Sequence, residues 1–384
     1  MHVAIDAQLL SEEASYRSAG VSNYSRQLLH ALGELVQAGV TAHSFTAYVH
    51  TRRFQAPGIA LARTRLPLER PELRILWEQC ALPWHLRAGH ADIVHGLVNV
   101  LPLATRAPGV VTVHDLSFMR TPGKLPPLKR AYLTLLCRLS VQRAAQIIAV
   151  SQQTAGDLAE WLGTAQGKLT VVYNGVAPEF SPPPPEAMER IRTQRALPQR
   201  FLLYVGTLEP RKNLEVLVRA YSSWRQQAGP TGHDVELVLA GARGWYYDEI
   251  FAAVRELGLE HNVHFPGFIP THELPALYGA AEAFIYPSLF EGFGLPVLEA
   301  MACGAPVICS QAQSLLEVAG DAALTFPPHD VTALAHAIQL LLTQPRLRER
   351  LQKEGRDRAA RFSWRRTAEA TLAVYDQAAA VSGR

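Results

Sequence analysis

Two series of short β-rich segments, each alternating with longer helical patterns, constrain the fold of this chain most strongly. In such an order each helix connects one strand to a parallel neighbour. The predicted strands of the first series are residues 2–6, 44–49, 92–95, 109–114, 146–151 and 169–173. Those of the second series are residues 201–206, 235–241, 263–265, 283–287, 306–309 and 322–326. The pattern predicts an α/β protein with two doubly wound, Rossmann-like domains.

A proline-rich segment separates the two series. Proline lacks a backbone donor and disrupts helix interiors, so residues 176–186 read as a semi-stiff linker, which we extend to 176–200. The first domain then covers residues 1–175 and the second covers 201–363. Helical patterns are predicted at 21–37, 73–88, 128–144, 152–162, 330–343 and 346–380. The last pattern exceeds what the second sheet needs, so we expect about 364–384 to cross back to the first domain.

Two such domains are expected to enclose a cleft, because ligands of open α/β sheets bind beyond the carboxyl ends of the strands. No run of 18 or more apolar residues can span a bilayer. No signal peptide is visible at the start of the sequence, and the four cysteines form no C-x-x-C pair. We expect a cytoplasmic protein, at most peripheral to the inner face of a membrane.

Charge is divided unevenly between the two halves. Residues 1–175 carry 17 basic and 11 acidic side chains, whereas the remainder carries 20 basic and 23 acidic ones. Residues 116–156 contain no acid, and their basic residues are Arg120, Lys124, Lys129, Arg130, Arg138 and Arg143. Two interpretations remain open: a solvated helix face, or contact with an anionic surface, for which membrane headgroups come before nucleic acid.

The segment Glu291-Gly-Phe-Gly-Leu-Pro-Val-Leu-Glu299 carries the strongest chemical signal. Proline near its middle and Gly304 beyond it predict a short helix from about Leu295 to Cys303. Its start is glycine-lined, so the backbone amides of Phe293, Gly294 and Leu295 suit a diphosphate. The two flanking carboxylates would repel phosphate but could accept hydrogen bonds from sugar and ribose hydroxyls. The alternative is a loop charge at Glu291 and a solvated helix residue at Glu299.

Arg211 and Lys212 follow the first predicted strand of the second domain. Cations at the carboxyl edge of a strand are well placed for a pyrophosphate. The alternative is a surface salt bridge to Glu209 or Glu215.

Two histidines end predicted strands of the first domain. His114 precedes Asp115, and that position favours a functional role over a structural one. His95 ends another strand in a similar way, and both roles remain open for it.

The first predicted strand–helix loop covers residues 7–20 and lacks the G-x-G-x-x-G pattern of dinucleotide-binding proteins. Walker A, H-E-x-x-H, G-x-S-x-G and EF-hand patterns are also missing from the sequence. These absences disfavour a dehydrogenase, a P-loop ATPase, a zincin and a serine hydrolase.

These features together resemble retaining glycosyltransferase family 4, which has the GT-B fold, over almost the whole chain. The Glu-x7-Glu motif with Arg211-Lys212 upstream carries the resemblance. The segments Ile5-Asp-Ala-Gln-Leu-Leu10, Gly20-Val-Ser-Asn-Tyr24 and Tyr173-Asn-Gly-Val176 look most like bacterial mannosyltransferases of O-antigen and exopolysaccharide synthesis.

The resemblance implies a role for each candidate residue. Glu291 would hold donor-sugar hydroxyls, Glu299 the ribose, and Arg211 with Lys212 the diphosphate. The main chain near Gly267 and Phe268 would bind the base. His114 would lie by the donor sugar, and the loop ending at Gly20 would approach the phosphate and the acceptor. No metal and no cofactor are implied.

Two positions depart from the family pattern. Thr207 stands where many relatives have an arginine, which leaves more of the phosphate binding to Arg211 and Lys212. Ser22 stands where relatives often have a second glycine, which puts close phosphate contact there in doubt.

The expected activity is transfer of a hexose, with mannose from GDP-mannose favoured, to a hydroxyl acceptor with retained anomeric configuration. We expect a nucleotide-sugar donor, an acceptor that can be lipid-linked, contact with an anionic membrane and no nucleic acid. Cell-surface polysaccharide or glycolipid synthesis would use this reaction. The alternatives are a nucleotide-sugar epimerase or phosphorylase of the same fold, and a non-catalytic sugar-binding protein.

Overall fold

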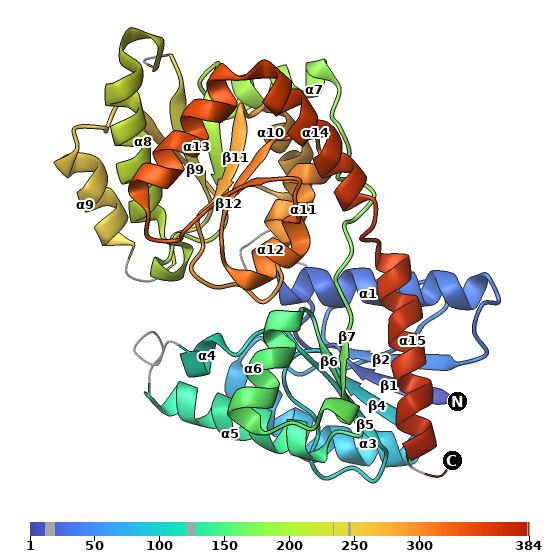
Figure 1. Cartoon of the computed structure of the whole chain (residues 1–384). Coiled ribbons are helices and arrows are strands. Elements are labelled where there is room, and N and C mark those ends of the chain that lie inside the picture. Colours follow the sequence, from blue (N-terminus) through green and yellow to red (C-terminus); the bar gives the residue numbers. More distant parts are fainter. Residues whose placement is uncertain (12–19, 121–126, 233, 245–246, 382, 384) are drawn as a thin grey trace. The chain divides into compact units, whose positions relative to one another are not determined.

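The computed structural model describes residues 1–11, 20–120, 127–232, 234–244, 247–381 and 383. It divides into two compact units, each built on its own parallel sheet (Figure 1). The first unit comprises Met1–Gly175 and Ser363–Arg384, and the second comprises Val176–Phe362. Each unit is described by itself below.

The first unit is a parallel sheet with the strand order β3-β2-β1-β4-β5-β6-β7. Its strands are β1 (His2–Asp6), β2 (Ser44–Val49), β3 (Ala60–Arg63), β4 (Ile93–Gly96), β5 (Gly109–Val113), β6 (Gln146–Ala149) and β7 (Leu169–Val171). Every residue of β4, β5 and β6 is buried, which explains the continuous apolar runs of their sequences. The strand β3 was not predicted, because its four residues are exposed or half-buried and give no apolar run.

Helices cover both faces of this sheet. They are α1 (Val21–Gln37), α2 (Pro71–Leu76), α3 (Leu82–Ala88), α4 (Ser117–Arg120), α5 (Pro127–Arg143), α6 (Gln152–Leu162) and α15 (Trp364–Val381). A π-helical turn, Trp77–Ala81, joins α2 to α3. Side chains of α3, α5 and α6 share one core with the sheet, while α1 packs beside α15, as Figure 1 shows.

The predicted return of the chain to the first domain is confirmed by α15. Tyr375 of this helix hydrogen-bonds through its hydroxyl group to Nδ1 of His95, 2.7 Å away. The hydroxyl of Thr367 donates to the carbonyl of Tyr173. A Cβ atom on Gly175 would lie 2.1 Å from the backbone nitrogen of Trp364, so only glycine permits this close approach.

The second unit has the strand order β10-β9-β8-β11-β12-β13, again in parallel. Its strands are β8 (Phe201–Val205), β9 (Glu236–Ala240), β10 (Val263–Gly267), β11 (Ala283–Tyr286), β12 (Val307–Ser310) and β13 (Leu324–Phe326). Its helices are α7 (Pro185–Gln194), α8 (Leu214–Ala228), α9 (Asp248–Glu256), α10 (Leu274–Ala280), α11 (Leu295–Ala302), α12 (Gln313–Ala319), α13 (Val331–Thr343) and α14 (Pro345–Ala359). The two sheets therefore confirm the predicted pair of doubly wound domains.

The range 176–200 differs from the linker expected from its prolines. Pro185 begins α7, and the first turn of a helix accepts proline because its N–H would have no partner there. A Cβ atom on Gly279 of α10 would lie 2.3 Å from Cγ of Pro183. Arg195 makes two hydrogen bonds of 2.8 Å to the carboxylate of Glu273. Much of this range is therefore packed into the second unit.

Candidate active site

The predicted helix after the glycine-rich loop is present as α11, whose first residue is Leu295. Gly294 precedes it with φ 109°, a left-handed conformation that side chains disfavour. A Cβ atom at this position would also lie 2.5 Å from Cδ2 of Leu315. The aromatic ring of Phe293 is buried 6.0 Å from that of Phe362. The glycine thus lets the chain turn sharply into a helix whose first amides point out of its N-terminus.

Arg211 and Lys212 lie in a short 3-10 turn, Pro210–Lys212, after β8, and both contact the loop after β11. Nζ of Lys212 donates to Oε1 of Glu291 at 2.6 Å, and Nη1 of Arg211 donates to Oε2 at 3.0 Å. The order of the second sheet reverses between β8 and β11. These three candidate residues therefore meet at its topological switch point, where ligands of such sheets bind.

Glu291 is held ionised by this arrangement. Burial acts to raise its pKa, but the charges of Arg211 and Lys212 outweigh that effect and lower the pKa to about 2. The hydroxyl of Ser288 also donates to Oε1. The carboxylate expected to meet sugar hydroxyls thus already accepts hydrogen bonds from two cations.

The two cations have further partners. Nε of Arg211 donates to Glu209 at 3.0 Å, and this pair was the alternative weighed from the sequence. Nζ of Lys212 donates to the hydroxyl of Tyr286 at 2.7 Å. Burial lowers the pKa of Lys212, against the raising effect of Glu291. Because two carboxylates balance two cations, the cluster carries no surplus positive charge.

Glu299 lies inside α11 and is buried rather than solvated. Its carboxylate accepts a hydrogen bond of 3.0 Å from the hydroxyl of Tyr278. Burial is the main cause that raises the pKa of Glu299 to about 7, and the charge of Glu179 acts in the same direction. The two carboxylates of the motif therefore differ in charge at neutral pH: Glu291 is ionised and Glu299 titrates.

Gly267 and Phe268 lie at the same carboxyl edge of the second sheet. Gly267 ends β10 with φ 78°, and its carbonyl accepts a hydrogen bond of 2.8 Å from the amide of Gly241. A Cβ atom on Gly241 would lie 1.9 Å from the carbonyl oxygen of Gly206. Glycines thus lie at the carboxyl ends of three neighbouring strands: Gly267 is the last residue of β10, and Gly206 and Gly241 directly follow β8 and β9. Phe268 follows Gly267 and is half-buried.

His114 directly follows β5 in the first unit, so the strand ends one residue before the predicted end, and the imidazole of His114 is partly buried. Its Nε2 lies 2.9 Å from the carbonyl of Leu97, so this nitrogen carries the proton and donates. Burial lowers the pKa of His114 and keeps the ring neutral, against the effects of that hydrogen bond and of Asp115. Its ring also meets Tyr24 edge-on at 4.5 Å. Asp115 accepts instead from the amide of Ser117.

His95 is a structural residue. It is fully buried, and its two ring nitrogens contact the hydroxyls of Tyr375 and Thr112. Burial, with a smaller effect of His114, lowers its pKa to about 3. The functional interpretation left open for this residue is therefore wrong.

Gly20 precedes α1 with φ 57°, and a Cβ atom there would meet nothing within 4 Å. Most of the loop that it ends, residues 12–19, lies outside the described residues. Ser22 is buried, and its hydroxyl accepts a hydrogen bond of 2.8 Å from the amide of Ser11. Its side chain therefore fixes the position of Ser11.

Sequence reasoning missed several polar residues that complete this site. Ser288 and Tyr286 contact the Lys212–Glu291 pair, and Tyr278 contacts Glu299. For Tyr286 the available signal was a tyrosine inside an otherwise apolar strand, because a buried phenol needs a hydrogen-bond partner.

Metal and membrane features can be judged for the described part of the chain. Within it, no three His, Cys, Asp or Glu side chains are grouped closely enough to hold a metal ion. In the same residues, every helix is too short or too polar to cross a bilayer.

Comparison with known proteins decides the family. Residues 187–358 match the family described as glycosyl transferases group 1, and residues 19–180 match glycosyltransferase family 4. The chain is similar to O-antigen chain mannosyltransferase B of Escherichia coli, with 33% identity over 293 residues. That alignment covers 76% of each protein. The chain belongs to glycosyltransferase family 4.

Solved structures agree with this assignment. Sucrose-phosphate synthase from Thermosynechococcus elongatus matches this family 4 glycosyltransferase with a TM-score of 0.79 and 25% identity, over 98% of each chain. HepE from Anabaena, solved with UDP and glucose, matches with a TM-score of 0.74 and 19% identity over 98% of this chain and 99% of its own. The second likeness shows the fold alone. Both confirm the GT-B fold expected from the resemblance.

Proposed function

We propose that this glycosyltransferase moves mannose from GDP-mannose to a hydroxyl group of a saccharide acceptor, with retention of anomeric configuration and without a metal. The observation that carries the proposal is the cluster of Arg211, Lys212 and Glu291 beside the start of α11. The mannosyl donor is favoured by the similarity to an O-antigen chain mannosyltransferase. The same similarity favours a saccharide acceptor, because that relative acts on an O-antigen chain.

The cluster and the start of α11 together suit a departing diphosphate. In the proposed reaction the bond between C1 of mannose and the diphosphate oxygen breaks. The acceptor oxygen bonds to C1 on the same face, and its proton leaves with the diphosphate. Arg211 and Lys212 would then stabilise negative charge that develops on the leaving group, and fixed cations need little reorganisation. The amides at Gly294 and Leu295 would add the positive end of a helix dipole.

Glu299 would bind the ribose of the nucleotide. Its carboxylate is buried and has one hydrogen-bond donor among the described residues, Tyr278. A carboxylate accepts more than one hydrogen bond, so a ribose hydroxyl could add a second. Glu291 would accept hydrogen bonds from the sugar hydroxyls through the lone pairs that Arg211 and Lys212 do not use.

Transfer is tested by supplying GDP-mannose or UDP-glucose, with and without α-mannobiose. We expect GDP release and a trisaccharide product only when GDP-mannose and mannobiose are both present. The configuration of the new linkage, read by NMR, tests retention.

Conversion of the donor sugar to an isomer in the absence of acceptor would indicate an epimerase. Formation of a sugar 1-phosphate when inorganic phosphate is added would indicate a phosphorylase. Binding of sugar without any turnover would indicate a non-catalytic protein. UDP-glucose is included because HepE was solved with UDP and glucose. If UDP-glucose were the better donor, guanine would be the wrong base and mannose the wrong sugar.

We also propose that α5 contacts an anionic membrane that carries a lipid-linked acceptor. Cys137, Ser140 and Val141 of this helix face the sheet and are buried, so one side of α5 packs on the first sheet. The opposite side leaves Leu135 56% and Leu139 37% exposed. Of three further apolar residues of α5, Tyr132 and Leu136 are half-buried, and the side chain of Leu128 lies outside the described ones.

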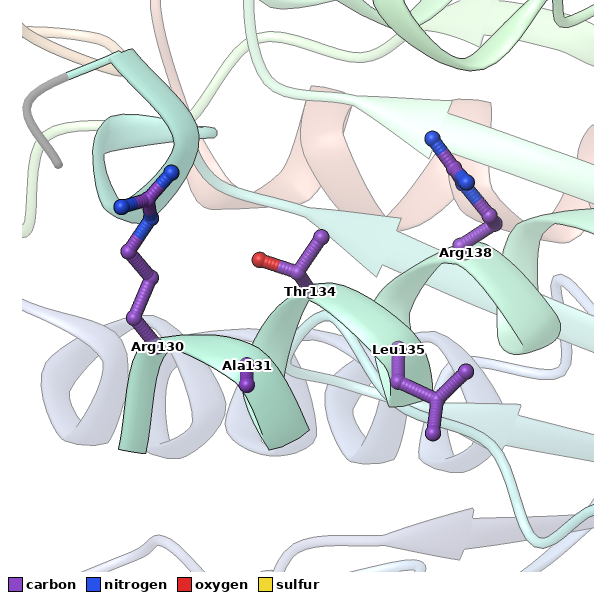
Figure 2. Close-up of a pocket in the computed structure, with 5 residues that line it drawn as sticks. All are labelled: Arg130, Ala131, Thr134, Leu135 and Arg138. Carbon is purple, nitrogen blue, oxygen red and sulfur yellow. The ribbon is translucent and has the colours of Figure 1, made fainter. Parts of the chain in front are cut away.

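Basic side chains accompany these exposed leucines. Figure 2 shows Arg130, Thr134 and Arg138 extending from one side of α5, around an open hollow that Leu135 also lines. Within the described residues, Arg130 and Arg138 form no ion pair. Apolar side chains between uncompensated arginines match the boundary between anionic headgroups and acyl chains.

A further inference from the structure

A small polar hollow lies at the topological switch point of the first sheet. The strand order reverses between β1 and β4. Asp6 and Gln8, at the end of β1 and just beyond it, line the hollow together with Leu97 and Val98 beyond β4. Its volume of about 20 Å³ is enough for one water molecule or one hydroxyl group. The position is equivalent to that of the Lys212–Glu291 pair in the second sheet.

Gln8 is buried without the hydrogen bonds that its amide requires. The residue is 2% exposed, and neither Oε1 nor Nε2 has a partner among the described residues. An unpaired buried amide destabilises the folded state. Such a group is expected where a ligand supplies the missing partners.

Two carboxyl groups share the hollow with Gln8. Glu78 comes from the π-helical turn after α2 and lies 3.4 Å from Nε of Arg74. Burial, together with the nearby charge of Asp6, raises the pKa of Glu78 to about 8. Burial also raises the pKa of Asp6, against the lowering effects of the Gln8 amide and of Arg74. At neutral pH the pair therefore presents one carboxylate and one protonated carboxyl group.

This set of groups matches a neutral hydroxyl. The carboxylate and the Gln8 carbonyl accept hydrogen bonds, whereas the protonated carboxyl and the Gln8 amide donate them. A phosphate would be repelled by the charge of the pair. A hydroxyl group both donates and accepts, and its size fits the hollow.

We propose that Asp6, Gln8 and Glu78 bind a hydroxyl group of the acceptor saccharide. This inference rests on the proposed function, in which the switch point of the second sheet serves the donor. The first sheet offers the equivalent position to the second substrate. The site selects an acceptor by the placement of one hydroxyl group, because an analogue that lacks it leaves buried polar groups unpaired.

The test compares Gln8→Met with the unaltered protein and with Gln37→Met as a matched control. Methionine keeps the approximate length of glutamine and removes its hydrogen bonds, and Gln37 is exposed at the end of α1. Binding of α-mannobiose is measured by calorimetry in the presence of GDP, and transfer from GDP-mannose is measured separately. We expect Gln8→Met to weaken mannobiose binding about tenfold or more, a loss of one to two hydrogen bonds, and to leave GDP binding unchanged. Gln37→Met should change neither.

Thermal unfolding separates this role from a structural one. Loss of an unpaired buried amide should leave the melting temperature of Gln8→Met unchanged or higher, whereas removal of a structural hydrogen bond would lower it. Equal mannobiose affinity in Gln8→Met and the unaltered protein, or no mannobiose binding by either, would overturn the inference. If Gln8→Met loses mannobiose binding but GDP-mannose supports no transfer in any variant, the hydroxyl site stands and the donor proposal fails.

Discussion

The carboxylate of Glu291 accepts a 2.6 Å hydrogen bond from Lys212 and so joins the loops after β8 and β11. Both side chains are buried, and a second hydrogen bond from Arg211 reaches the same carboxylate. Removal of one partner from such a pair leaves an uncompensated buried charge.

Substitution of the two motif glutamates should have different effects. Glu291→Ala should lower turnover about a hundredfold while GDP affinity is kept or increased, because Arg211 and Lys212 lose a competing anion. Glu299→Ala should weaken GDP binding about tenfold, because a ribose contact is lost. Calorimetric GDP binding and steady-state turnover measure the two effects. The assignment is wrong if Glu291→Ala weakens GDP binding as much as Glu299→Ala does.

GDP binding should depend on pH through Glu299. Burial raises the pKa of this carboxyl to about 7, and the ionised form accepts stronger, charge-assisted hydrogen bonds from hydroxyl donors than the protonated form does. Affinity for GDP should therefore increase about tenfold between pH 6 and pH 8. Glu299→Gln cannot ionise and should bind GDP weakly with a flat profile over this range. An unchanged slope in Glu299→Gln would assign the pH dependence to another group.

The pKa of Glu299 also predicts a trend in stability. The folded state holds a proton that the unfolded chain releases near pH 4.5, so this group destabilises the fold as pH rises from about 4.5 to about 7. Glu299→Gln should remove this trend. Urea unfolding at pH 5 and pH 7.5, compared with the unaltered protein, measures the difference.

Transfer should persist in excess EDTA. The groups proposed to stabilise the leaving diphosphate are the side chains of Arg211 and Lys212 and the start of α11. The rate of GDP release with mannobiose should stay within about twofold of the untreated rate. A loss of activity that magnesium or manganese restores would contradict the proposal.

Membrane contact should depend on charge at α5. At low salt we expect co-sedimentation with vesicles that contain anionic phosphatidylglycerol, and little with purely zwitterionic phosphatidylcholine. Binding should decrease as salt shortens the Debye length. Replacement of Arg130 and Arg138 by Gln should reduce binding by about 2 kcal/mol in total, at about 1 kcal/mol for each arginine. Arg219→Gln, on α8 with two carboxylate partners, is the matched control. Equal recovery with both vesicle types would remove the membrane proposal.

The sequence predicted those elements whose local signals agree with their packing. The helices α1, α6 and α11 begin at the predicted residues, and Ser151 caps α6 by accepting from the amide of Thr154. A proline in the first turn of α11 and a glycine near each of its ends are local signals of the same kind.

Contacts between distant segments could not be predicted in this way. Lys212 and Glu291 are 79 residues apart. No local sequence pattern indicates that Lys212 forms an ion pair with Glu291, and the sequence predicted only that Lys212 would bind phosphate. Gln8 and Glu78 are 70 residues apart, and Glu78 lies in a π-helical turn that no local signal predicted, yet both line the same hollow. The helix α7 was missed because prolines were taken as a linker signal, although Pro185 occupies a position that favours helix initiation.

The return of α15 to the first unit has a consequence for how the protein is made. The ribosome synthesises all the strands of the first sheet before it synthesises the second unit. The helix α15, which contacts Phe45 and His95, is synthesised only after the second unit. Until α15 is synthesised, part of the apolar face of the nascent first unit stays uncovered. The second unit, in contrast, is one continuous segment, Val176–Phe362. We infer that the second unit reaches its native state first during translation, and that the first unit is completed when α15 packs against it.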